Sequence, residues 1–316
     1  MNFLRRMCCP VCGATTAAAR AAVRSSPPAE NLTPDRHEAV LSGCGRRRSF
    51  FTYFRCWECG GLYCPVYYTG AQLATFYGHR PPNMHKVPLA DRQKTQRGYF
   101  EILAPYVNRE GDYLEVGPDI GLFAHICAEA IAFARFFLFE PNRNVHAAVR
   151  ARLSRWGICL APEPFRDGMV PRGTIGTAVL IHVLDHVIDP RALLAALHAA
   201  LRSDGTLFLV VHDERSLLAR ILGRHWPPYT AQHPQLFSRG SVTGLLRRCG
   251  FTVLEVRKTW NRLPLGYLLR VALKAAGFGF VASSGRNLLA IRLKLGNIAV
   301  VARKDGLSRR SGHVDP

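Results

Sequence analysis

The sequence has few acidic residues and no long apolar run. Its 316 residues include 22 Asp and Glu against 42 Lys and Arg, which gives a formal charge of +20. A field of that sign favours phosphates, anionic lipid surfaces or acidic partners, although arginine is spread through the whole chain. The chain lacks the roughly 18 consecutive apolar residues of a membrane span and the apolar N-terminal stretch of a secretory signal. We therefore expect a cytoplasmic protein, with peripheral contact with a membrane left open.

Disulfides are not expected, because cytoplasmic cysteines stay reduced or bind metal. Two Cys-x-x-Cys-Gly motifs supply a set of four thiols: Cys9, Cys12, Cys56 and Cys59. Paired motifs of this kind present four thiolates to one tetrahedral ion, which is typical of structural zinc. Cys8, Cys44 and Cys64 remain rival ligands. We expect residues 1–88 to form a zinc-ribbon-like module, with an Ala/Arg and Pro/Ser tract inserted between the motifs.

From about residue 89, apolar runs alternate with helical patterns, which is typical of a parallel sheet covered by helices on both faces. The predicted strands are residues 113–116, 136–139, 158–161, 177–181, 206–211, 252–257 and 298–302. The predicted helices lie near residues 121–134, 143–156, 190–201 and 239–249. The expected fold is α/β, with a Rossmann-like, seven-stranded, mostly parallel sheet in residues 89–303 and a basic tail at 304–316. Residues 50–54 and 62–68 have the aromatic enrichment of strands.

A glycine-containing loop links the first predicted strand of this sheet to a helix. Residues 115–121 read Glu-Val-Gly-Pro-Asp-Ile-Gly. Glycines there let the backbone turn tightly and approach a ligand, while the free amides of the helix start face it. Glu140 ends the next strand, where a carboxylate can accept hydrogen bonds from ribose hydroxyls. An NAD fingerprint has the spacing G-x-G-x-x-G, whereas this loop has only G-x-x-x-G, so NAD is the less favoured ligand.

On these motifs, residues 91–303 resemble the class I S-adenosylmethionine-dependent methyltransferases of type 11/23. Residues 179–190, 201–207, 233–238 and 248–251 also carry the resemblance. It implies that Glu115, Gly117 and Gly121 form the pocket for the amino-acid end of the cofactor and that Glu140 holds its ribose. The rest of the expected cofactor-binding set is Asp119, Pro141, Asn142 and His182.

The sequence departs from the family pattern at two positions. Asp119 replaces the usual middle glycine of the loop, where it either binds the cations of the cofactor or weakens the site. Gly176 replaces the acidic residue often found just before the fourth strand, so that position has no expected role.

Methyl transfer from a sulfonium needs a base only when the acceptor must lose a proton, because positioning of the activated donor can itself lower a barrier by about 7–11 kcal/mol. Histidine suits proton removal near neutral pH, and such folds place their chemistry after the strands. The candidates are His182, Asp185, His186 and His233, with His212 and Asp213 after the next strand. Two other roles stay open: His182 can line the cofactor pocket, and Asp185 can orient His186.

Residues 262–296 form a late insertion between the last two predicted strands. Apolar residues at helical spacing from 265 to 280, with Arg270 and Lys274 beside them, indicate a basic amphipathic helix. Such a helix can cover an apolar acceptor, contact a membrane surface through residues 262–282, or pack on its own domain.

The function these observations predict is methyl transfer to a small-molecule or lipid-linked saccharide. One alternative is an RNA methyltransferase, with an arginine run at 46–48 and with Phe50, Phe51 and Tyr53 stacking on bases. The other is a non-catalytic Rossmann binding module, in which Asp119 makes the glycine loop unable to bind the cofactor. Oligomeric state and acceptor atom are not predicted.

Overall fold

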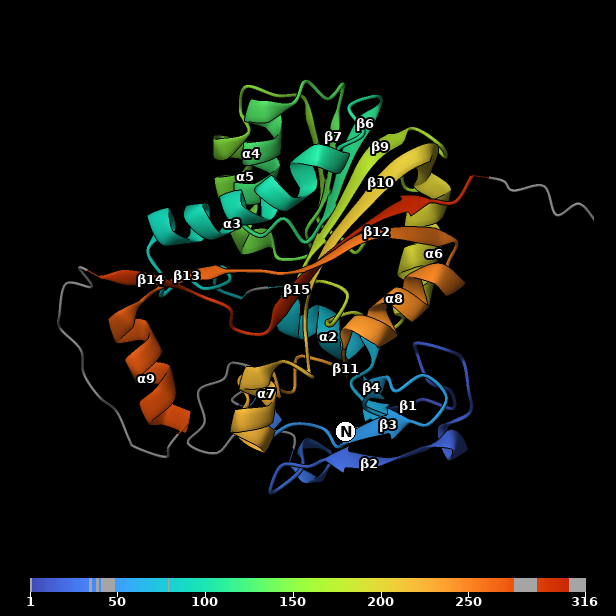
Figure 1. Cartoon of the computed structure of the whole chain (residues 1–316), viewed down its shortest axis with the longest axis vertical. Coiled ribbons are helices and arrows are strands. Elements are labelled where there is room, and N and C mark those ends of the chain that lie inside the picture. Colours follow the sequence, from blue (N-terminus) through green and yellow to red (C-terminus); the bar gives the residue numbers. More distant parts are fainter. Residues whose placement is uncertain are drawn as a thin grey trace, which may run out of the picture.

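The computed structural model describes residues 2–33, 36–37, 40, 49–78, 80–275 and 289–306. Figure 1 shows an α/β unit with one large twisted sheet. A smaller region, built mostly from the N-terminal residues, lies below this unit in the view. No helix of these residues is long and apolar enough to cross a bilayer.

The large sheet has seven strands in the order β12-β15-β10-β9-β6-β7-β8. Its strands are β6 (Asp112–Val116), β7 (Phe136–Phe139), β8 (Ile158–Ala161), β9 (Ile175–Ile181), β10 (Leu201–His212), β12 (Phe251–Lys258) and β15 (Asn297–Lys304). The strands from β8 to β10 are parallel, and β15 runs antiparallel to both β10 and β12. The chain order reverses between β6 and β9, and doubly wound sheets bind ligands at the carboxyl ends of the strands on either side of such a point.

Helices cover both faces of this sheet (Figure 1). On one face lie α3 (Leu89–Leu103), α4 (Leu122–Ala130) and α5 (His146–Arg152), whose apolar side chains share a core with β10 and β15. On the other face, α6 (Pro190–Ala200) and α8 (Arg239–Arg248) share a second core with the same strands. The predicted α/β fold, with a seven-stranded, mostly parallel sheet, is confirmed.

Side chains cap the starts of the two helices that were predicted near residues 190–201 and 239–249. The carboxylate of Asp189 accepts hydrogen bonds from the amides of Arg191 and Ala192 at the start of α6. Ser238 and Ser241 form a reciprocal capping box at the start of α8. Such caps satisfy amides that have no partner inside the helix, each contributing about 1 kcal/mol. The shorter elements of the α/β unit are η3 (Ala104–Tyr106), η4 (Arg143–Val145), α7 (Leu217–Leu222) and η5 (Gly223–His225).

The N-terminal region contains two small sheets. Its elements are β1 (Leu4–Arg5), η1 (Thr16–Ala18), β2 (Ala19–Val23), η2 (Ala29–Asn31), β3 (Tyr53–Cys56), β4 (Leu62–Tyr63), β5 (Val66–Tyr67) and α2 (Gly70–Tyr77). The four-stranded sheet has the order β11-β4-β3-β2, and β1 pairs with β5. Strand β11 (Gln235–Leu236) comes from the α/β unit, so this sheet joins the two parts of the chain. The Ala/Arg tract is not merely an insertion, since its second half is β2, hydrogen-bonded to β3.

The aromatic residues proposed to stack on RNA bases lie inside the protein. Phe50, Phe51 and Tyr53 are at most 2% exposed, and their rings pack against Tyr229 and Tyr67. The prediction that they stack on bases is therefore wrong, because these rings form the core of the N-terminal region. Cys44 and the arginine run at 46–48 lie outside the described residues.

The late insertion contains an antiparallel pair of strands, β13 (Asn261–Pro264) and β14 (Ala290–Leu293), that the sequence did not predict. Helix α9 (Leu265–Ala275) follows β13, which confirms the predicted helix as far as residue 275. Residues 276–288 and the tail from 307 lie outside the described residues. Leu265 and Leu269 of α9 are 48% and 57% exposed, so part of the apolar side of this helix faces solvent.

Gly176, which had no expected role, is the second residue of β9, where a side chain cannot fit. A Cβ atom built there would lie 2.0 Å from the carbonyl oxygen of Glu110. We expect Gly176→Ala to lower the free energy of unfolding by about 1–3 kcal/mol, because a backbone atom cannot yield as a side chain can. Urea denaturation measures this. Gly157→Ala is the control, since nothing lies within 4 Å of the place that its added methyl group would occupy, and equal stability of both variants would contradict the account.

Candidate functional site

The loop after β6 holds three residues in the left-handed backbone conformation. Gly117, Asp119 and Gly121 have φ of 70°, 51° and 75°. That conformation is unstrained only for glycine, and non-glycine residues held in it cluster at functional sites. A Cβ atom on Gly117 would lie 2.7 Å from Cγ2 of Val183. The loop therefore packs closely against the segment after β9, and it leads directly into α4.

Glu140 connects this loop to the segment after β7. One of its carboxylate oxygens accepts a hydrogen bond from the amide of Asp119 at 3.0 Å, and the other from the amide of Asn142 at 2.9 Å. The side chain is buried, and burial raises the pKa of Glu140 to about 7. Pro141 follows Glu140, and the Asn142 side chain caps the next short helix by accepting from the amide of Asn144. The structure thus brings the expected ribose-binding carboxylate against the glycine loop.

Two further carboxylates surround the loop. Glu115 is buried and accepts a hydrogen bond from the hydroxyl of Tyr113 at 2.7 Å. Burial raises the pKa of Glu115 to about 8, and it also raises the pKa of Asp119. The buried Glu115 and Glu140 and the half-buried Asp119, all with raised pKa values, form a site that gains from a positively charged ligand. A cation stabilises their ionised forms.

A cover over this loop was not predicted from the sequence. The carboxylate of Asp119 accepts from the amide of Asn83 at 3.0 Å, and the side-chain amide of Asn142 donates to the carbonyl of Arg80 at 2.9 Å. These contacts fix the segment between α2 and α3 onto both halves of the candidate cofactor site. They also give Asp119 a structural partner that its place in the motif could not reveal.

The four histidines and the aspartate of the candidate acceptor side lie together. His182, Asp185 and His186 follow β9, His212 ends β10, and His233 precedes β11. The ring centroids of His182 and His212 are 4.5 Å apart, those of His212 and His233 are 4.9 Å apart, and those of His186 and His233 are 4.4 Å apart. Asp213, by contrast, accepts from the amide of Arg215 within its own turn.

Two of these histidines form a hydrogen-bond chain that leaves no ring nitrogen free. Nδ1 of His233 lies 2.6 Å from the carbonyl of Pro228, so it carries the proton and its Nε2 accepts. Nε2 of His186 lies 3.1 Å from that Nε2 and must donate to it, which leaves Nδ1 of His186 to accept from the hydroxyl of Tyr77 at 3.1 Å. His186 and His233 therefore hold each other in fixed tautomers.

The other two histidines have open positions. Nδ1 of His212 hydrogen-bonds to Oδ2 of Asp185, and the His212 side chain is 18% exposed. His182 has φ of 53°, a strained value for histidine. Nδ1 of His182 and Oδ1 of Asp185 are buried, and neither has a hydrogen-bond partner in the described part of the chain. Unsatisfied buried polar atoms are costly, and their presence here indicates a place for a ligand or water.

The pKa of Asp185 and the pKa values of two histidines around it are lowered for different reasons. Burial lowers the pKa of His182 to about 3 and of His233 to about 4, with neighbouring histidines adding to the effect. Burial alone would raise the pKa of Asp185, but the charge and hydrogen bond of His212 outweigh it and hold that pKa below its ordinary value. The site is therefore a group of mostly neutral imidazoles around one ionised carboxylate.

The N-terminal region supports both segments that carry the histidines, through residues the sequence did not single out. The Arg6 guanidinium donates to the carbonyl of Ile188 at 2.6 Å and to the Gln235 side chain at 3.1 Å. The Gln235 amide in turn donates to the carbonyls of Leu184 and Val187, each at 2.8 Å. Loop-to-loop contacts of this kind could not be found from spacing, because their partners are distant backbone carbonyls.

The four cysteines of the two motifs come together as predicted. The Sγ atoms of Cys9 and Cys59 are 3.7 Å apart, and so are those of Cys12 and Cys56. Four sulfurs at about 2.3 Å from a tetrahedral zinc are separated by about 3.8 Å, so the spacing fits that ion. Of the rival ligands, Cys8 is exposed, and Cys64 is buried elsewhere, with its thiol near the carbonyls of Phe51 and His233.

Several solved structures are similar in fold. They include an S-adenosylmethionine-dependent methyltransferase of Methanosarcina mazei, with 15% identity, coverage of 65% of this chain and 97% of that one, and a TM-score of 0.45. One from Aquifex aeolicus has 10% identity, 65% and 89% coverage, and a TM-score of 0.45. A third is the 1,6-didemethyltoxoflavin-N1-methyltransferase of Burkholderia thailandensis, solved with S-adenosylhomocysteine, at 19% identity, 67% and 79% coverage and a TM-score of 0.45.

No curated protein matches the sequence. The family profile described as a methyltransferase domain matches residues 90–256, which is more than half of the chain. That match spans the glycine loop, Glu140 and all four histidines of the site, on a seven-stranded sheet whose chain order reverses beside the loop. The chain therefore belongs to the methyltransferase-domain family, as a class I S-adenosylmethionine-dependent methyltransferase.

Proposed function

We propose that this methyltransferase acts on a hydroxyl group of a small-molecule or lipid-linked saccharide, and that His212 accepts the proton of that hydroxyl. The observation that carries the proposal is the pair of His212 with buried Asp185 at the carboxyl ends of two adjacent strands. A hydroxyl is a weak nucleophile, and a positioned base typically speeds its reaction by about 10²–10⁴-fold.

Each residue of the site has a distinct role in the proposed reaction. Asp185 accepts from Nδ1 of His212 and so leaves Nε2 of His212 as the nitrogen with a free lone pair. His186 and His233 wall the site in fixed neutral tautomers, and the orphan Nδ1 of His182 is available to orient the acceptor. S-adenosylmethionine, when bound, supplies an activated methyl group; Glu140, Gly117 and Asp119 would hold it.

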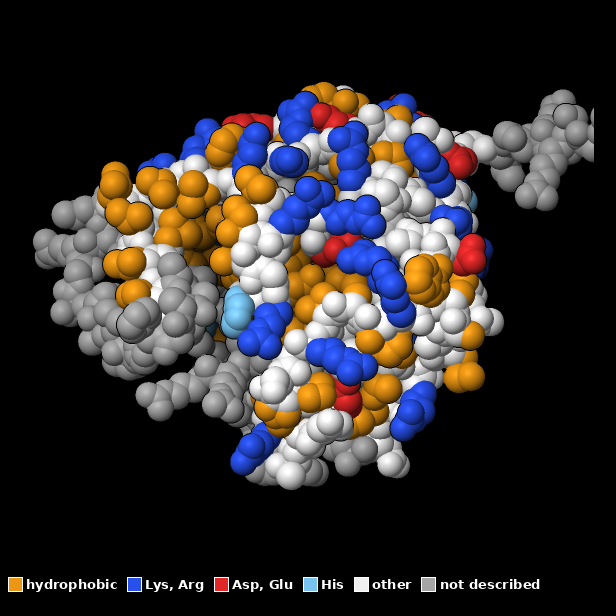
Figure 2. Space-filling model, turned by 60° about the horizontal axis from the view of Figure 1, so that its bottom comes forward, with side chains coloured by type: hydrophobic (Ala, Val, Ile, Leu, Met, Phe, Trp, Pro, Cys, Tyr) orange, Lys and Arg blue, Asp and Glu red, His pale blue; other side chains and the backbone are white. Residues whose placement is uncertain are grey.

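The aromatic residues predicted to contact RNA do not favour an RNA acceptor. Figure 2 shows many Lys and Arg side chains interspersed with hydrophobic side chains on one face of the molecule. Single-stranded nucleic acids stack their bases on exposed aromatic side chains, whereas the aromatic residues after the arginine run are buried. The exposed Leu265 and Leu269 of α9 support a lipid-linked acceptor, since they offer an apolar surface for contact.

We also infer that Cys9, Cys12, Cys56 and Cys59 hold one structural zinc ion. The equal 3.7 Å separations of their sulfurs support this, and so does the position of the two motifs on turns beside β3. A closed set of four thiolates has no open position for a substrate, so this ion would stabilise structure and take no part in the chemistry.

Transfer of an isotopically labelled methyl group tests the proposal. Purified protein is incubated with labelled S-adenosylmethionine and, separately, with saccharides, lipid-linked glycans and RNA, and products are identified by mass spectrometry. We expect label on a saccharide oxygen, with His212→Gln greatly reduced. Label on RNA, or on a saccharide at equal rates in both proteins, would contradict the proposal.

The raised pKa of Glu140, about 7, leads to a prediction for cofactor binding. Near pH 7 this carboxyl is partly protonated in the free protein, and a bound sulfonium and ammonium favour its ionised form. Binding of S-adenosylmethionine should therefore release protons, most of them at or just below pH 7. Calorimetry in buffers of different ionisation enthalpy measures the release. Glu140→Gln should diminish the release, whereas the control Glu163→Gln, which removes a carboxylate paired with Arg166, should not. Identical release in both variants would show that Glu140 is not involved.

A further inference from the structure

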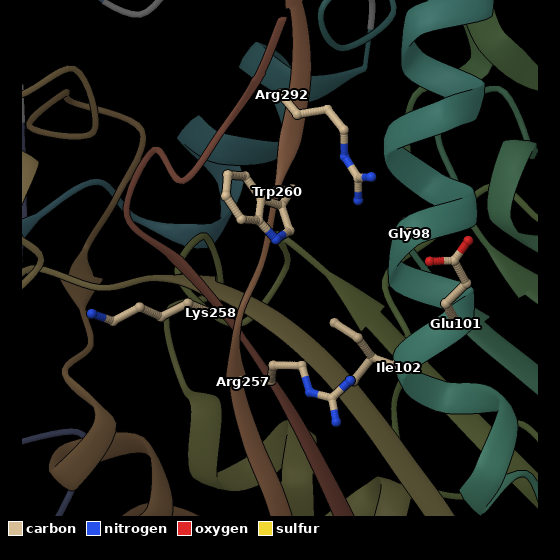
Figure 3. A pocket seen from close by; sticks show the side chains of 7 residues that line it. All are labelled: Gly98, Glu101, Ile102, Arg257, Lys258, Trp260 and Arg292. Atoms are coloured by element: carbon tan, nitrogen blue, oxygen red, sulfur yellow. The ribbon is translucent and has the colours of Figure 1, made fainter.

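A cavity of about 190 Å³ lies between α3, the end of β12 and β14. It is lined by Gly98, Glu101, Ile102, Arg257, Lys258, Trp260 and Arg292. Figure 3 shows the guanidinium groups of Arg257 and Arg292 directed into the space beside α3, with the Trp260 ring between them, whereas Lys258 extends away. A shallower extension adds Lys94, Arg97 and Arg262. The cofactor and histidine sites do not use these residues.

The charge of this cavity is strongly positive. Six cationic side chains line it and its extension, against one carboxylate, that of Glu101. Arg257 and Arg262 are paired with Glu255 and Asp91 outside the lining. Within the described ranges, no carboxylate lies within ion-pairing distance of Arg292, so its guanidinium is available to a ligand. Guanidinium groups bind phosphate oxygens in a bidentate manner and are weakly hydrated, which suits them to phosphate recognition.

The cavity also has an exposed aromatic wall. Trp260 is 43% exposed, and its ring lies 4.5 Å from Nζ of Lys294 and 5.8 Å from the guanidinium carbon of Arg292. Cation–π contacts hold both cations beside the Trp260 ring without neutralising them. The cavity and its extension measure about 190 and 270 Å³. Each is below the roughly 300–1,000 Å³ of drug-sized ligand sites, so each accommodates a compact anionic group.

The cavity lies on the same edge of the sheet as the candidate base. His212 pairs with Asn297 of β15, and the amide of Thr259 donates to the carbonyl of Asn297. Two strand spacings, about 10 Å, therefore separate the backbones of His212 and Thr259. At this edge a hydrogen-bond network joins Asn297, Asn261 and Tyr99 of α3. One acceptor molecule could reach both places.

We propose that this cavity binds the diphosphate group of a diphosphate-linked saccharide acceptor. The inference rests on the proposed function for the identity of the acceptor, but the binding of diphosphate can be measured without methyl transfer. Two sources carry this chemistry, a nucleoside diphosphate and an isoprenoid diphosphate, and the direct probe common to both is inorganic pyrophosphate.

Calorimetric titration of the full chain with pyrophosphate tests the site. We expect saturable binding that weakens at least tenfold in Arg292→Gln and in Arg257→Gln. Glu101→Gln should tighten binding, because it removes the one carboxylate in the lining. Arg20→Gln is the control, since Arg20 also lies over an exposed tryptophan, Trp57, at 4.5 Å but in the N-terminal region. Melting temperatures establish that each variant is folded.

The two sources are then compared with uridine diphosphate and farnesyl diphosphate under the same conditions. Tighter binding of either one, lost in Arg292→Gln, supports the proposal and identifies the carrier. No binding of pyrophosphate by the folded protein, equal affinity in all variants, or binding of an RNA oligonucleotide in preference to all three diphosphates would overturn it. Label on a saccharide oxygen without pyrophosphate binding would refute the site alone, whereas pyrophosphate binding without any methyl transfer would refute the proposed function alone.

Discussion

Replacing His212 with Gln should lower the rate of methyl transfer by about 10²–10⁴-fold while leaving the affinity for S-adenosylmethionine unchanged. The reason is geometric: His212 is the histidine whose Nδ1 bonds to a buried carboxylate, and the cofactor loop lies on other strands. Asp185→Asn should produce a fall of similar size, because an amide can donate to Nδ1 and stabilise the wrong tautomer of His212. Turnover and cofactor affinity are measured on the same samples.

The controls separate a base from a structural histidine. His125→Gln, on α4, removes a partly exposed histidine 3.5 Å from Glu129 and should change neither quantity. His233→Gln breaks the chain to His186 and should lower the melting temperature as well as the rate. If His212→Gln kept full turnover while His233→Gln lost it at unchanged stability, the base would have to be reassigned to His233.

Removal of zinc should unfold the N-terminal region and abolish methyl transfer. Structural zinc sites contribute about 10–16 kcal/mol of apparent binding free energy, which is comparable to the whole stability of a domain. The hydroxyls of Tyr53 and Tyr67 donate to the carbonyls of His233 and Ala231 at 2.7 and 2.9 Å, so the histidine segment depends on this region. Cys56→Ser or a strong chelator should therefore stop turnover, whereas cofactor binding should persist.

The measurement combines metal analysis, near-ultraviolet circular dichroism and turnover. Wild-type protein should hold one zinc ion per chain, and Cys56→Ser should hold much less. Cys8→Ser is the matched control, because Cys8 neighbours Cys9 in sequence but is exposed and outside the cluster. A fully active, folded Cys56→Ser protein without zinc would contradict both the metal assignment and its structural role.

The sequence predicted the parts of the fold that repeat or alternate. The strands at 136–139 and 158–161 match β7 and β8 residue for residue, since short apolar runs bounded by turn residues are typical of strands in a parallel sheet. The helices predicted near residues 190 and 239 begin where α6 and α8 begin, because their caps, Asp189 and Ser238, act on adjacent residues only. The four-cysteine cluster was predictable for the same reason, as each motif carries two ligands three residues apart.

Features that depend on distant contacts were not predictable. Strand β2 forms from an Ala/Arg tract without a strand pattern, because its pairing with β3 supplies the hydrogen bonds that its composition does not indicate. The tautomers of His233 and His186 depend on hydrogen bonds to Pro228 and Tyr77, and neither of these residues belongs to a recognisable motif. From the sequence, one role left open for Asp185 was to orient His186. In the structure the carboxylate of Asp185 hydrogen-bonds to His212 instead.

The central claim is that the glycine loop and Glu140 form a working S-adenosylmethionine site in spite of Asp119. Calorimetric titration of the full chain with S-adenosylhomocysteine is the test, because this product of the cofactor binds without turnover. We expect one molecule to bind per chain, with the affinity lost in Glu140→Ala. No binding by a folded sample that carries one zinc ion would contradict it, and would favour a binding module with a degenerate loop.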